Sequence, residues 1–576
     1  MKKNIKKITW ISFIAIGALL IFFPNKARVQ NEDFPFDPSF AQLKNLDERH
    51  PKIDHMLYMI LQVYENSSLE HAKKIAKGMD VDFVGDDIRV VAVENRMPLP
   101  NGAKGSIPLT PQIQALGGAV ETSYKDLYQS TIGLYALRSL SDLPSVGHVR
   151  LPYKPRELVV SEGVQNTGAG DWHSLTSYHS QGAKVCILDG GFTGYGALLG
   201  TELPSTVETR SFRADNNLET SVHGTACAEI VHDMAPDAQL GLVNFGTDVE
   251  HHNAVAWIIS EGYQVVSYSM GWGYSLGPGT GSGPIHDDVE DFVDSGGVWV
   301  GAAGNSAEDH WQGNFSDPDS DGRLNFAVGS EWFGFRVYPF VPFIIWLRWN
   351  DWGDWNGTNF NTSRDYSDWD MRLYSAYGGG AYLWGAFGVQ GQNRWAYEII
   401  SGWANFYASL SVTVNRWWDP NVGTREFDLE FWNCYGIEHP VAAGSVTLPG
   451  DSPDSLTVGA IDHATNAYHT YSSQGPTDDG RIKPDICAPA GVSTNTYGPA
   501  LAAPPGLLSL FQLRPYGFYG TSAATPHVAG ALGLILDKTG FSPIQAKDVV
   551  LNRLIEMGAA GKDNMFGAGR LNLRNN

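Results

Sequence analysis

The stretch from Tyr519 to Gly530 constrains the fold most, because it places a serine where the chain turns sharply into a helix. Gly520 permits the turn, and Pro526 is tolerated in the first turn of a helix, where its missing N–H would have no acceptor. An apolar run over Val528–Leu536 follows and predicts a buried helix. Ser522 is therefore expected at a helix N-terminus, whose dipole stabilises a negatively charged oxygen. The alternative is a serine that only caps a core helix.

Three other segments place polar side chains where strands end or helices begin. A short apolar strand ends on Asp189, a second predicted helix begins near His223, and a further strand ends shortly before Asn305. The segments are Val185–Gly191, Ser221–Ala228 and Val298–Ser306. Taken singly, each residue has a simpler interpretation, as a turn residue for Asp189 and Asn305 and as a helix cap for His223.

Together the four motifs, in the order aspartate, histidine, asparagine, serine, resemble those of the subtilisin-like serine protease family. The resemblance extends over about residues 170–573, apart from a long insertion. Any one of these motifs is weak by itself, whereas four in the family's order form a specific signature. The resemblance implies a subtilisin-like catalytic domain.

The resemblance also assigns a role to each of the four residues. Ser522 would be the nucleophile and His223 its base, because a serine hydroxyl is a weak nucleophile until its proton is removed. Asp189 would hold the imidazole in one tautomer. The Asn305 amide and the backbone N–H of Ser522 would form the oxyanion hole. Three positions depart from the family's usual serine or threonine, histidine and methionine: Gly190, Ala226 and Ala523. Gly190 is expected to cost one hydrogen bond near the carboxylate.

Two further segments resemble the walls of the family's pocket for the residue on the amino side of the scissile bond. One wall consists of Ser269, Met270 and Gly271, and the other of Ala302, Ala303 and Gly304. These residues are uncharged and mostly small, which leaves room for a large apolar or aromatic side chain. The implied substrates are proteins or peptides with such a residue at that position.

The N-terminus predicts export. Met1–Lys7 is basic and Ile8–Phe23 is apolar, so we expect residues 1–29 to be a signal peptide or a retained membrane anchor. The protein would then be secreted or extracytoplasmic. The net charge of -22 argues against nucleic acid as a partner. Most of the four cysteines lie in apolar segments, so no disulfide framework is expected.

Two regions separate the export segment from the catalytic domain. Residues 30–87 are polar, and we assign no chemistry to them. Residues 88–157 predict a β-α-β-β-α-β order, which resembles the propeptide that chaperones and inhibits many members of the family. The alternative is an independent small α+β domain. If the segment is a propeptide, the chain is expected to cut itself within Arg150–Gly163.

Alternating strands and helices predict an α/β catalytic domain with a parallel sheet, split between residues 158–314 and 448–576. Helices would cover both faces, and the functional residues would lie at the carboxyl ends of the strands. The predicted strands are Lys184–Leu188, Gln239–Val243, Gln264–Ser269 and Gly297–Ala302. The predicted helices are Thr225–His232, Asn253–Glu261 and Asp287–Asp294.

Residues 315–447 interrupt this pattern and contain most of the chain's 18 tryptophans. Strand-like runs such as Phe343–Trp349 predict an inserted antiparallel β-sandwich. Its aromatic side chains would either fill its own core, which we favour, or form a platform for a sugar or peptide ligand.

The run Asp317-Pro-Asp319-Ser-Asp321-Gly has the spacing of a calcium-binding loop. Val328 replaces the glutamate expected at the twelfth position of such a loop, and an Asp-rich surface turn is an equal alternative. The expected chemistry requires no cofactor, so calcium bound by Asp317, Asp319 and Asp321 would be structural.

These observations predict a secreted serine endopeptidase that forms an acyl-enzyme and is made as a self-processing zymogen. Its own propeptide would be its intramolecular inhibitor. The alternative is a cell-surface protein that binds carbohydrate or protein through the inserted domain, with the protease serving only maturation.

Overall fold

The computed structural model describes residues 50–574 with internal gaps. The gaps are 79–80, 96, 99–103, 106–107, 153–155, 158–162, 175–181, 362–366, 389–394, 405 and 499–516. Within the described part, no helix has both the length and the apolar character needed to cross a bilayer. The predicted signal peptide or anchor, residues 1–29, lies outside the described residues.

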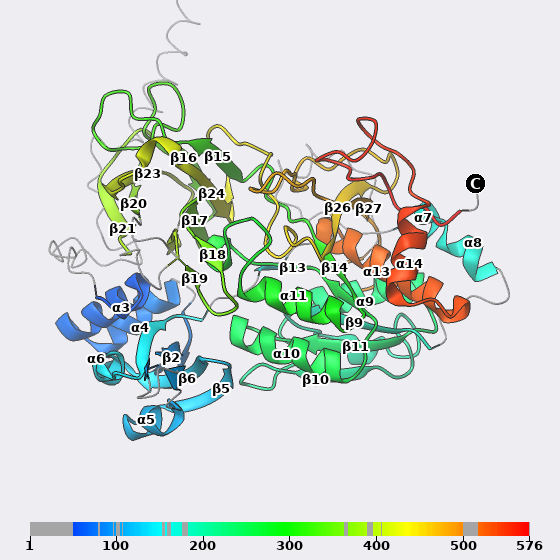
Figure 1. Ribbon diagram of the computed structural model, residues 1–576, viewed down its shortest axis with the longest axis horizontal. Coiled ribbons are helices and arrows are strands. Elements are labelled where there is room, and N and C mark those ends of the chain that lie inside the picture. The colour runs from blue at the N-terminus through cyan, green and yellow to red at the C-terminus, as the bar shows by residue number, and fades with distance from the viewer. Residues whose placement is uncertain are drawn as a thin grey trace, which may run out of the picture.

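Seven parallel strands form the central sheet, in the order β10-β11-β9-β12-β14-β26-β27 (Figure 1). The strands are β9 (Lys184–Asp189), β10 (Glu208–Ser211), β11 (Gln239–Asn244), β12 (Val265–Tyr268), β14 (Val298–Ala302), β26 (Leu456–Asp462) and β27 (Ile486–Ala490). Apart from the edge strand β10, their side chains are nearly all buried, as expected when helices cover both faces of a parallel sheet. The predicted α/β fold with a parallel sheet is confirmed.

Two helical layers cover this sheet. One face packs against α9 (His223–Met234), α13 (Thr521–Thr539) and α14 (Pro543–Leu551), and the other against α10 (Asp248–Ser260) and α11 (Pro284–Asp294). Side chains of β9 alternate between the two cores, since Val185 and Ile187 join the first and Cys186 and Leu188 the second. α10 begins five residues before the predicted start, because the Thr247 side chain accepts a hydrogen bond from the helix's first turn.

An antiparallel sheet precedes the parallel one. Its strands are β1 (Phe83–Val84), β2 (Asp87–Glu94), β5 (Ala119–Tyr124), β6 (Leu127–Gly133) and β7 (Val146–Arg150). Its helices are α3 (His55–Asn66), α4 (Leu69–Gly78), α5 (Thr110–Ala115) and α6 (Leu137–Asp142). We call described residues 50–151 the N-terminal unit.

We expected one region to end at residue 87 and another to begin at residue 88. The packing of α3 and α4 against the sheet shows no such boundary. Leu57 and Ile75 from these helices are fully buried in one core with Val90 and Ile132 of the sheet. The described part of residues 30–87 therefore belongs to the same packed unit as the strands. Its polar composition concealed an apolar stripe on each helix.

Two antiparallel sheets, which we call the inserted sheets, interrupt the parallel one. The first contains β15 (His310–Asn314), β17 (Phe343–Trp349), β22 (Tyr397–Gly402) and β24 (Glu426–Trp432). The second contains β16 (Phe333–Val337), β20 (Asp368–Tyr374), β21 (Tyr382–Ala386), β23 (Ala408–Trp418) and β25 (Cys434–Tyr435). The sheets pack face to face through aromatic rings, with Phe333 and Phe431 centroids 5.0 Å apart. Most of the tryptophans with assigned exposure are buried or half-buried, as the core interpretation expects, although Trp417 and Trp418 are exposed.

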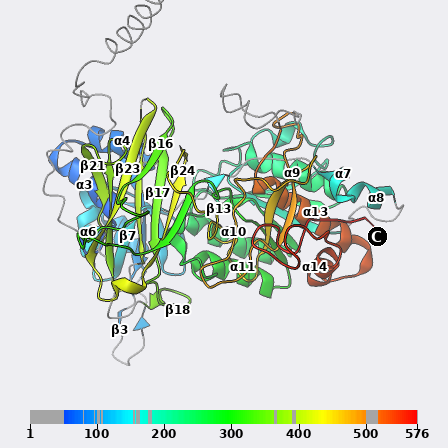
Figure 2. The same cartoon turned by 90° about the horizontal axis from the view of Figure 1, so that it is seen from above.

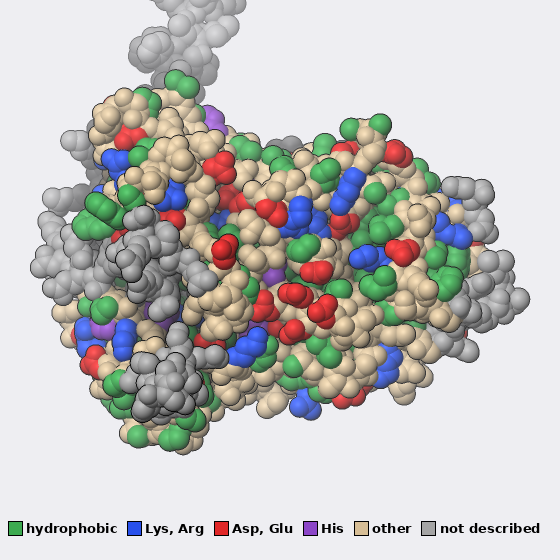
Figure 3. Space-filling model, viewed as in Figure 1, with side chains coloured by type: hydrophobic (Ala, Val, Ile, Leu, Met, Phe, Trp, Pro, Cys, Tyr) green, Lys and Arg blue, Asp and Glu red, His purple; other side chains and the backbone are tan. Residues whose placement is uncertain are grey.

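Smaller elements complete the described chain. They are β3 (Met97–Pro98), β4 (Lys104–Gly105), β8 (Arg156–Glu157), β13 (Met270–Gly271), β18 (Asp354–Trp355), β19 (Phe360–Asn361), α7 (Val164–Thr167) and α8 (Ala169–Ser174). Figures 1 and 2 place the N-terminal unit and the inserted sheets at one end of the molecule and the parallel sheet at the other. Acidic side chains gather over α11 on the face shown in Figure 3, in keeping with the net charge of -22.

Candidate active site

The fold gathers the four predicted polar residues at one edge of the parallel sheet. Asp189 is the last residue of β9, and Asn305 follows the end of β14 by three residues. His223 is the first residue of α9, and Ser522 is the second residue of α13. The carboxyl ends of parallel strands meet at the same edge, which is where α/β folds bind ligands.

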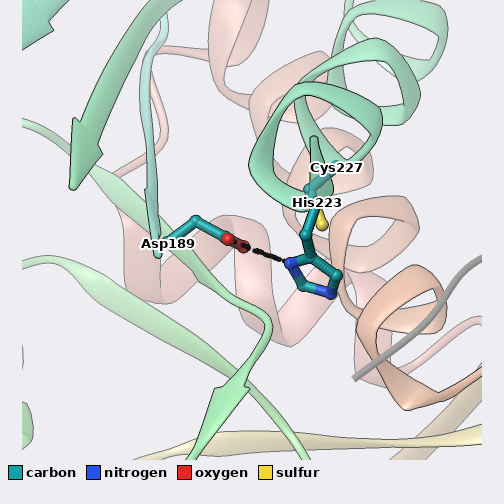
Figure 4. A group of neighbouring side chains, drawn as sticks. All are labelled: Asp189, His223 and Cys227. Atoms are coloured by element: carbon teal, nitrogen blue, oxygen red, sulfur yellow. Dashed lines mark hydrogen bonds and ion pairs between the residues drawn. The ribbon is translucent and has the colours of Figure 1, made fainter. Parts of the chain in front are cut away.

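Asp189 and His223 form a fully buried pair (Figure 4). His223 Nδ1 lies 2.9 and 2.8 Å from the two carboxylate oxygens of Asp189. The backbone N–H of Gly190 donates to Asp189 Oδ1 at 2.8 Å, so the backbone at this position supplies one hydrogen bond to the carboxylate. Gly224 allows this close approach, because a Cβ there would lie 2.6 Å from the carbonyl oxygen of Gly191. The carboxylate fixes the orientation of the imidazole through Nδ1.

Ser522 is held through both its side chain and its carbonyl group. Its Oγ donates to the carbonyl oxygen of Ser269 at 3.0 Å, and Ser269 Oγ donates to the carbonyl oxygen of Ser522 at 2.6 Å. Cys227 Sγ also lies 3.6 Å from that oxygen. Cys227 Sγ and one ligand atom each of Asp189 and His223 lie within 4.8 Å of one another, so the serine borders the buried pair. In the described contacts the Ser522 hydroxyl is bonded to Ser269 and not to His223.

Pro526 lies inside α13, five residues after the helix begins, and not in the first turn as expected. Proline has no N–H, so the carbonyl oxygen of Ser522, four residues earlier, receives no helical hydrogen bond from it. That oxygen is the one bonded by Ser269 Oγ. The proline therefore helps to fasten the start of α13 to the end of β12.

The Asn305 side chain is oriented by Thr521, a residue that the sequence reasoning did not single out. Asn305 Oδ1 accepts hydrogen bonds from the Thr521 backbone N–H at 2.9 Å and from its Oγ1 at 3.1 Å. Thr521 Oγ1 in turn accepts from the backbone N–H of Gly304 at 3.2 Å. These bonds fix Oδ1 of the Asn305 amide. The amide nitrogen, Nδ2, is then the atom that could donate a hydrogen bond to an oxyanion. The sequence offered one indication of this role, because Thr521 directly precedes Ser522.

The residue after Asn305 contacts the inserted sheets, which the sequence reasoning also missed. Ser306 Oγ donates to Oε1 of Glu430 on β24 at 2.6 Å, and Glu430 is fully buried. The backbone N–H of Ser306 donates to Ser473 Oγ at 3.0 Å. No local pattern indicates such a contact, because the two residues are 124 positions apart.

The two predicted pocket walls leave neighbouring strands of the sheet. Tyr268 of β12 pairs with Gly301 of β14, so the residues that come directly after these two positions run side by side. These residues are Ser269, Met270 and Gly271 on one side and Ala302, Ala303 and Gly304 on the other. Gly304 has a φ of +108°, and a Cβ there would lie 2.7 Å from the Thr447 side chain, so both backbone and space require glycine.

Among the residues that the structure describes, two further clusters have side chains of metal-ligand type. Asp317, Asp319 and Asp321 each have a carboxylate oxygen within 4.8 Å of the others, a donor set that suits calcium, although Arg323 pairs with Asp321 at 3.4 Å. The second cluster, His251, His252 and Asp288, is buried.

His251 and His252 of α10 both place Nδ1 2.7 Å from Oδ2 of Asp288 on α11. Burial raises the pKa of Asp288, but the two imidazoles outweigh it and lower the pKa to about 2. Tyr124 of the N-terminal unit stacks on the His252 ring, with centroids 4.5 Å apart. This cluster joins the two covering helices and lies outside the candidate active site.

Comparisons with known proteins relate the chain to serine proteases of the subtilase family. The sequence model of the subtilase family matches residues 438–569, which include Ser522. Serine protease AprX of Bacillus subtilis (strain 168) is 34% identical over 177 residues, which cover 27% of this chain and 38% of AprX. Subtilisin Savinase of Lederbergia lenta is 30% identical over 131 residues, covering 23% of this chain and 40% of the relative. The chain thus matches less than half the length of these relatives.

Among solved structures, the Clostridium perfringens CspB protease superposes with a TM-score of 0.48 and 14% identity. The superposition covers 71% of this chain and 97% of CspB.

Proposed function

The chain belongs to the subtilase family, and from this membership we propose that it is a serine endopeptidase that hydrolyses peptide bonds through an acyl-enzyme. The observation that carries the proposal is the buried Asp189–His223 pair beside Ser522 at the N-terminus of α13. A histidine fixed by a carboxylate next to a serine is the arrangement that activates a hydroxyl nucleophile.

Acylation begins when Ser522 Oγ leaves the Ser269 carbonyl and turns towards His223. Catalytic hydrogen bonds commonly tighten only when substrate is bound. His223 Nε2 takes the proton while Oγ attacks the substrate's carbonyl carbon. Asp189 stabilises the imidazolium that forms.

The oxyanion that develops on the substrate accepts hydrogen bonds from Asn305 Nδ2 and from the backbone N–H of Ser522. That N–H lies in the first turn of α13, where helical N–H groups have no acceptor within the helix. One such donor contributes about 3–4 kcal/mol to the transition state, a magnitude taken from a subtilisin. His223 then protonates the departing amine, and water releases the acyl group by the reverse sequence.

We further propose that the enzyme is exported as a zymogen whose N-terminal unit is its intramolecular inhibitor. The substrates would be proteins or peptides with an apolar or aromatic residue before the scissile bond. This preference follows from the uncharged walls at Met270 and Ala302–Gly304. Calcium at Asp317, Asp319 and Asp321 would serve stability and not the reaction, because the loop belongs to the inserted region.

A fluorophosphonate probe tests the reaction, because it reacts with an activated serine. We expect the purified wild type to be labelled and to hydrolyse casein, and the Ser522→Ala variant to do neither. The matched control is Ser316→Ala, which changes an exposed serine in a loop and is expected to keep both activities. Labelling that survives in Ser522→Ala would overturn the assignment of the nucleophile.

A further inference from the structure

The turn into α13 is held by hydrogen bonds to distant parts of the chain. The N-cap residue of this helix is Gly520, which has no side chain that could cap it. The backbone N–H of Gly520 donates instead to the hydroxyl oxygen of Tyr471, at 2.8 Å. The next N–H, that of Thr521, donates to Asn305 Oδ1 at 2.9 Å. The two N–H groups that precede Ser522 are therefore bonded by side chains from other segments.

Tyr471 also bonds the loop that carries Asn305. The carbonyl oxygen of Tyr471 accepts a hydrogen bond from the backbone N–H of Ala307 at 3.1 Å. Two residues after the tyrosine, the backbone N–H of Ser473 donates to the carbonyl oxygen of Gly304 at 2.9 Å. One short segment thus holds this loop on both sides of Asn305.

Tyr471 therefore connects the two donors of the proposed oxyanion hole. Its hydroxyl bonds the residue two positions before Ser522, and its carbonyl bonds the residue two positions after Asn305. We propose that Tyr471 is a positioning residue, which sets the distance between Asn305 Nδ2 and the backbone N–H of Ser522. The inference rests on the proposed function, because the oxyanion belongs to that reaction. The role requires no contact between Tyr471 and the substrate.

The hydroxyl of Tyr471 is supported by the parallel sheet. The His469 ring stacks on the Tyr471 ring, with centroids 4.8 Å apart and an interplanar angle of 15°. The N–H of His469 donates to the carbonyl oxygen of Ala460 on β26, at 3.2 Å. The N–H of Ala460 donates to Ser472 Oγ at 3.0 Å. A strand of the core thus fixes the residues on both sides of the tyrosine, as a precise site requires.

Removal of the hydroxyl should affect the transition state more than substrate binding. The Tyr471→Phe substitution leaves the N–H of Gly520, a buried residue, without its acceptor. The turn would then shift towards another acceptor, and the N–H of Ser522 would move with it. Because the oxyanion forms only during the reaction, a displaced donor lowers kcat and leaves KM nearly unchanged.

Steady-state hydrolysis of a peptide by the purified protein tests this expectation. We expect kcat of Tyr471→Phe to fall by about five- to tenfold, as for the loss of one hydrogen bond, with KM changed by less than about twofold. The matched control is Tyr263→Phe, which removes a hydroxyl that donates to Glu208 at 2.8 Å. Tyr263 lies before β12, at the opposite edge of the sheet, so this variant should keep the wild-type kcat. An unchanged kcat in Tyr471→Phe, or a rise in KM alone, would overturn the inference.

The same substitution in the Asn305→Leu background tests whether Tyr471 acts through the oxyanion hole. With the amide donor already absent, Tyr471→Phe should lower kcat by less than about threefold. A general loss of structure would instead lower kcat by the same factor in both backgrounds, and that result would overturn the role.

Fluorophosphonate labelling of the wild type separates this inference from the proposed function. A labelled and active wild type beside a fully active Tyr471→Phe would overturn the inference alone. A wild type that neither reacts with the probe nor hydrolyses the peptide would overturn the proposed function, and the inference with it.

Discussion

Two residues of the candidate site, His223 and Asn305, are oriented in the same way. In each, a neighbouring residue forms a hydrogen bond with one polar atom of the side chain, which fixes the direction of the other polar atom. Asp189 engages Nδ1 of His223, and in the proposed mechanism Nε2 transfers the proton. Thr521 engages Oδ1 of Asn305, and in the proposed mechanism Nδ2 donates to the oxyanion. Orientation of this kind lowers the reorganisation needed when charge develops in the transition state.

The Asn305→Leu substitution tests this at the oxyanion hole. It removes the amide donor while keeping a side chain of similar size, so we expect kcat to fall by about 10²–10³-fold with little change in KM. Steady-state kinetics with a peptide substrate measure both constants. Ser522 and His223 are untouched, so slow fluorophosphonate labelling should persist. A variant that raises KM and leaves kcat unchanged would contradict the role.

His527 is predicted to make stability depend on pH. Burial lowers the pKa of His527 to about 4. The hydrogen bond to the Ala523 carbonyl favours the charged form and raises the pKa, but its effect is smaller. The unfolded chain, with a histidine pKa near 6.5, therefore binds more protons between these values. Stability should fall as the pH drops from about 6.5 towards 4, by up to about 3 kcal/mol.

Urea unfolding at pH 7 and pH 4.5, in the Ser522→Ala background, measures this effect. The His527→Asn variant keeps a donor for the Ala523 carbonyl and does not titrate, so its loss of stability on acidification should be smaller. The same substitution at exposed His439 is the control and should leave the wild-type difference in place. Equal pH dependence in His527→Asn and the parent would contradict the prediction.

At the scale of elements, the inserted sheets support the loop that carries Asn305. Strand β24 delivers Glu430 to the Ser306 hydroxyl, so a segment outside the parallel sheet contacts the residue next to the oxyanion donor. The start of α13 is held in a comparable way, since the carbonyl that Pro526 leaves without a helical donor is bonded by Ser269. In both cases a side chain from another element fixes a backbone segment of the site.

The Ser306→Ala substitution tests the contact with β24. Removing the hydroxyl takes away one hydrogen bond from a buried carboxylate, which should cost about 1–3 kcal/mol of stability. A looser loop should also lower kcat by up to about tenfold, equivalent to about 1.4 kcal/mol in the barrier. Urea unfolding and peptide hydrolysis measure the two effects. Ser409→Ala, at an exposed position of β23, is the control. Full activity in Ser306→Ala would show that the loop is positioned without β24.

At the scale of the whole molecule, the N-terminal unit is fastened to the start of α10. Arg150 forms an ion pair with Asp248 at 2.5 Å, and both side chains are almost completely buried. Gln129 of β6 donates to Glu250 at 2.9 Å and accepts from Thr247 at 2.5 Å. Burial raises the pKa of Glu250, despite the hydrogen bonds that favour its charged form. If the N-terminal unit is released as proposed, these polar side chains must be solvated again.

The Arg150→Ala substitution should therefore loosen the N-terminal unit after processing. Leaving Asp248 buried without its partner costs about 3–5 kcal/mol, so the processed unit should dissociate more readily. Casein turnover is expected to begin after a lag at least about tenfold shorter than in the wild type. Arg138→Ala, which breaks an exposed pair with Glu65 within the unit, is the control and should keep the wild-type lag. An unchanged lag in Arg150→Ala would show that other contacts retain the unit.

Local patterns in the sequence were enough to predict the parallel sheet and the places of the candidate polar residues at its edge. Apolar runs of strand length ended on Asp189 and shortly before Asn305, and the glycine before Thr521 indicated where α13 begins. Such signals lie within a few neighbouring residues, where turn chemistry and periodicity act. The same reasoning misplaced Pro526 and separated residues 50–87 from the sheet they cover.

The sequence by itself thus indicated which segments form the parallel sheet and its helices and which polar side chains lie where they end or begin, because those properties depend on near neighbours. Tertiary structure alone decided three other features: the contact of Glu430 with Ser306, the hydrogen bonds between Ser269 and Ser522, and the register of β8 on β13. Each joins residues more than 100 positions apart, and a one-residue shift of a strand would change its partners completely. Packing of the whole chain selects among these registers, since only one buries the apolar faces of all the elements together.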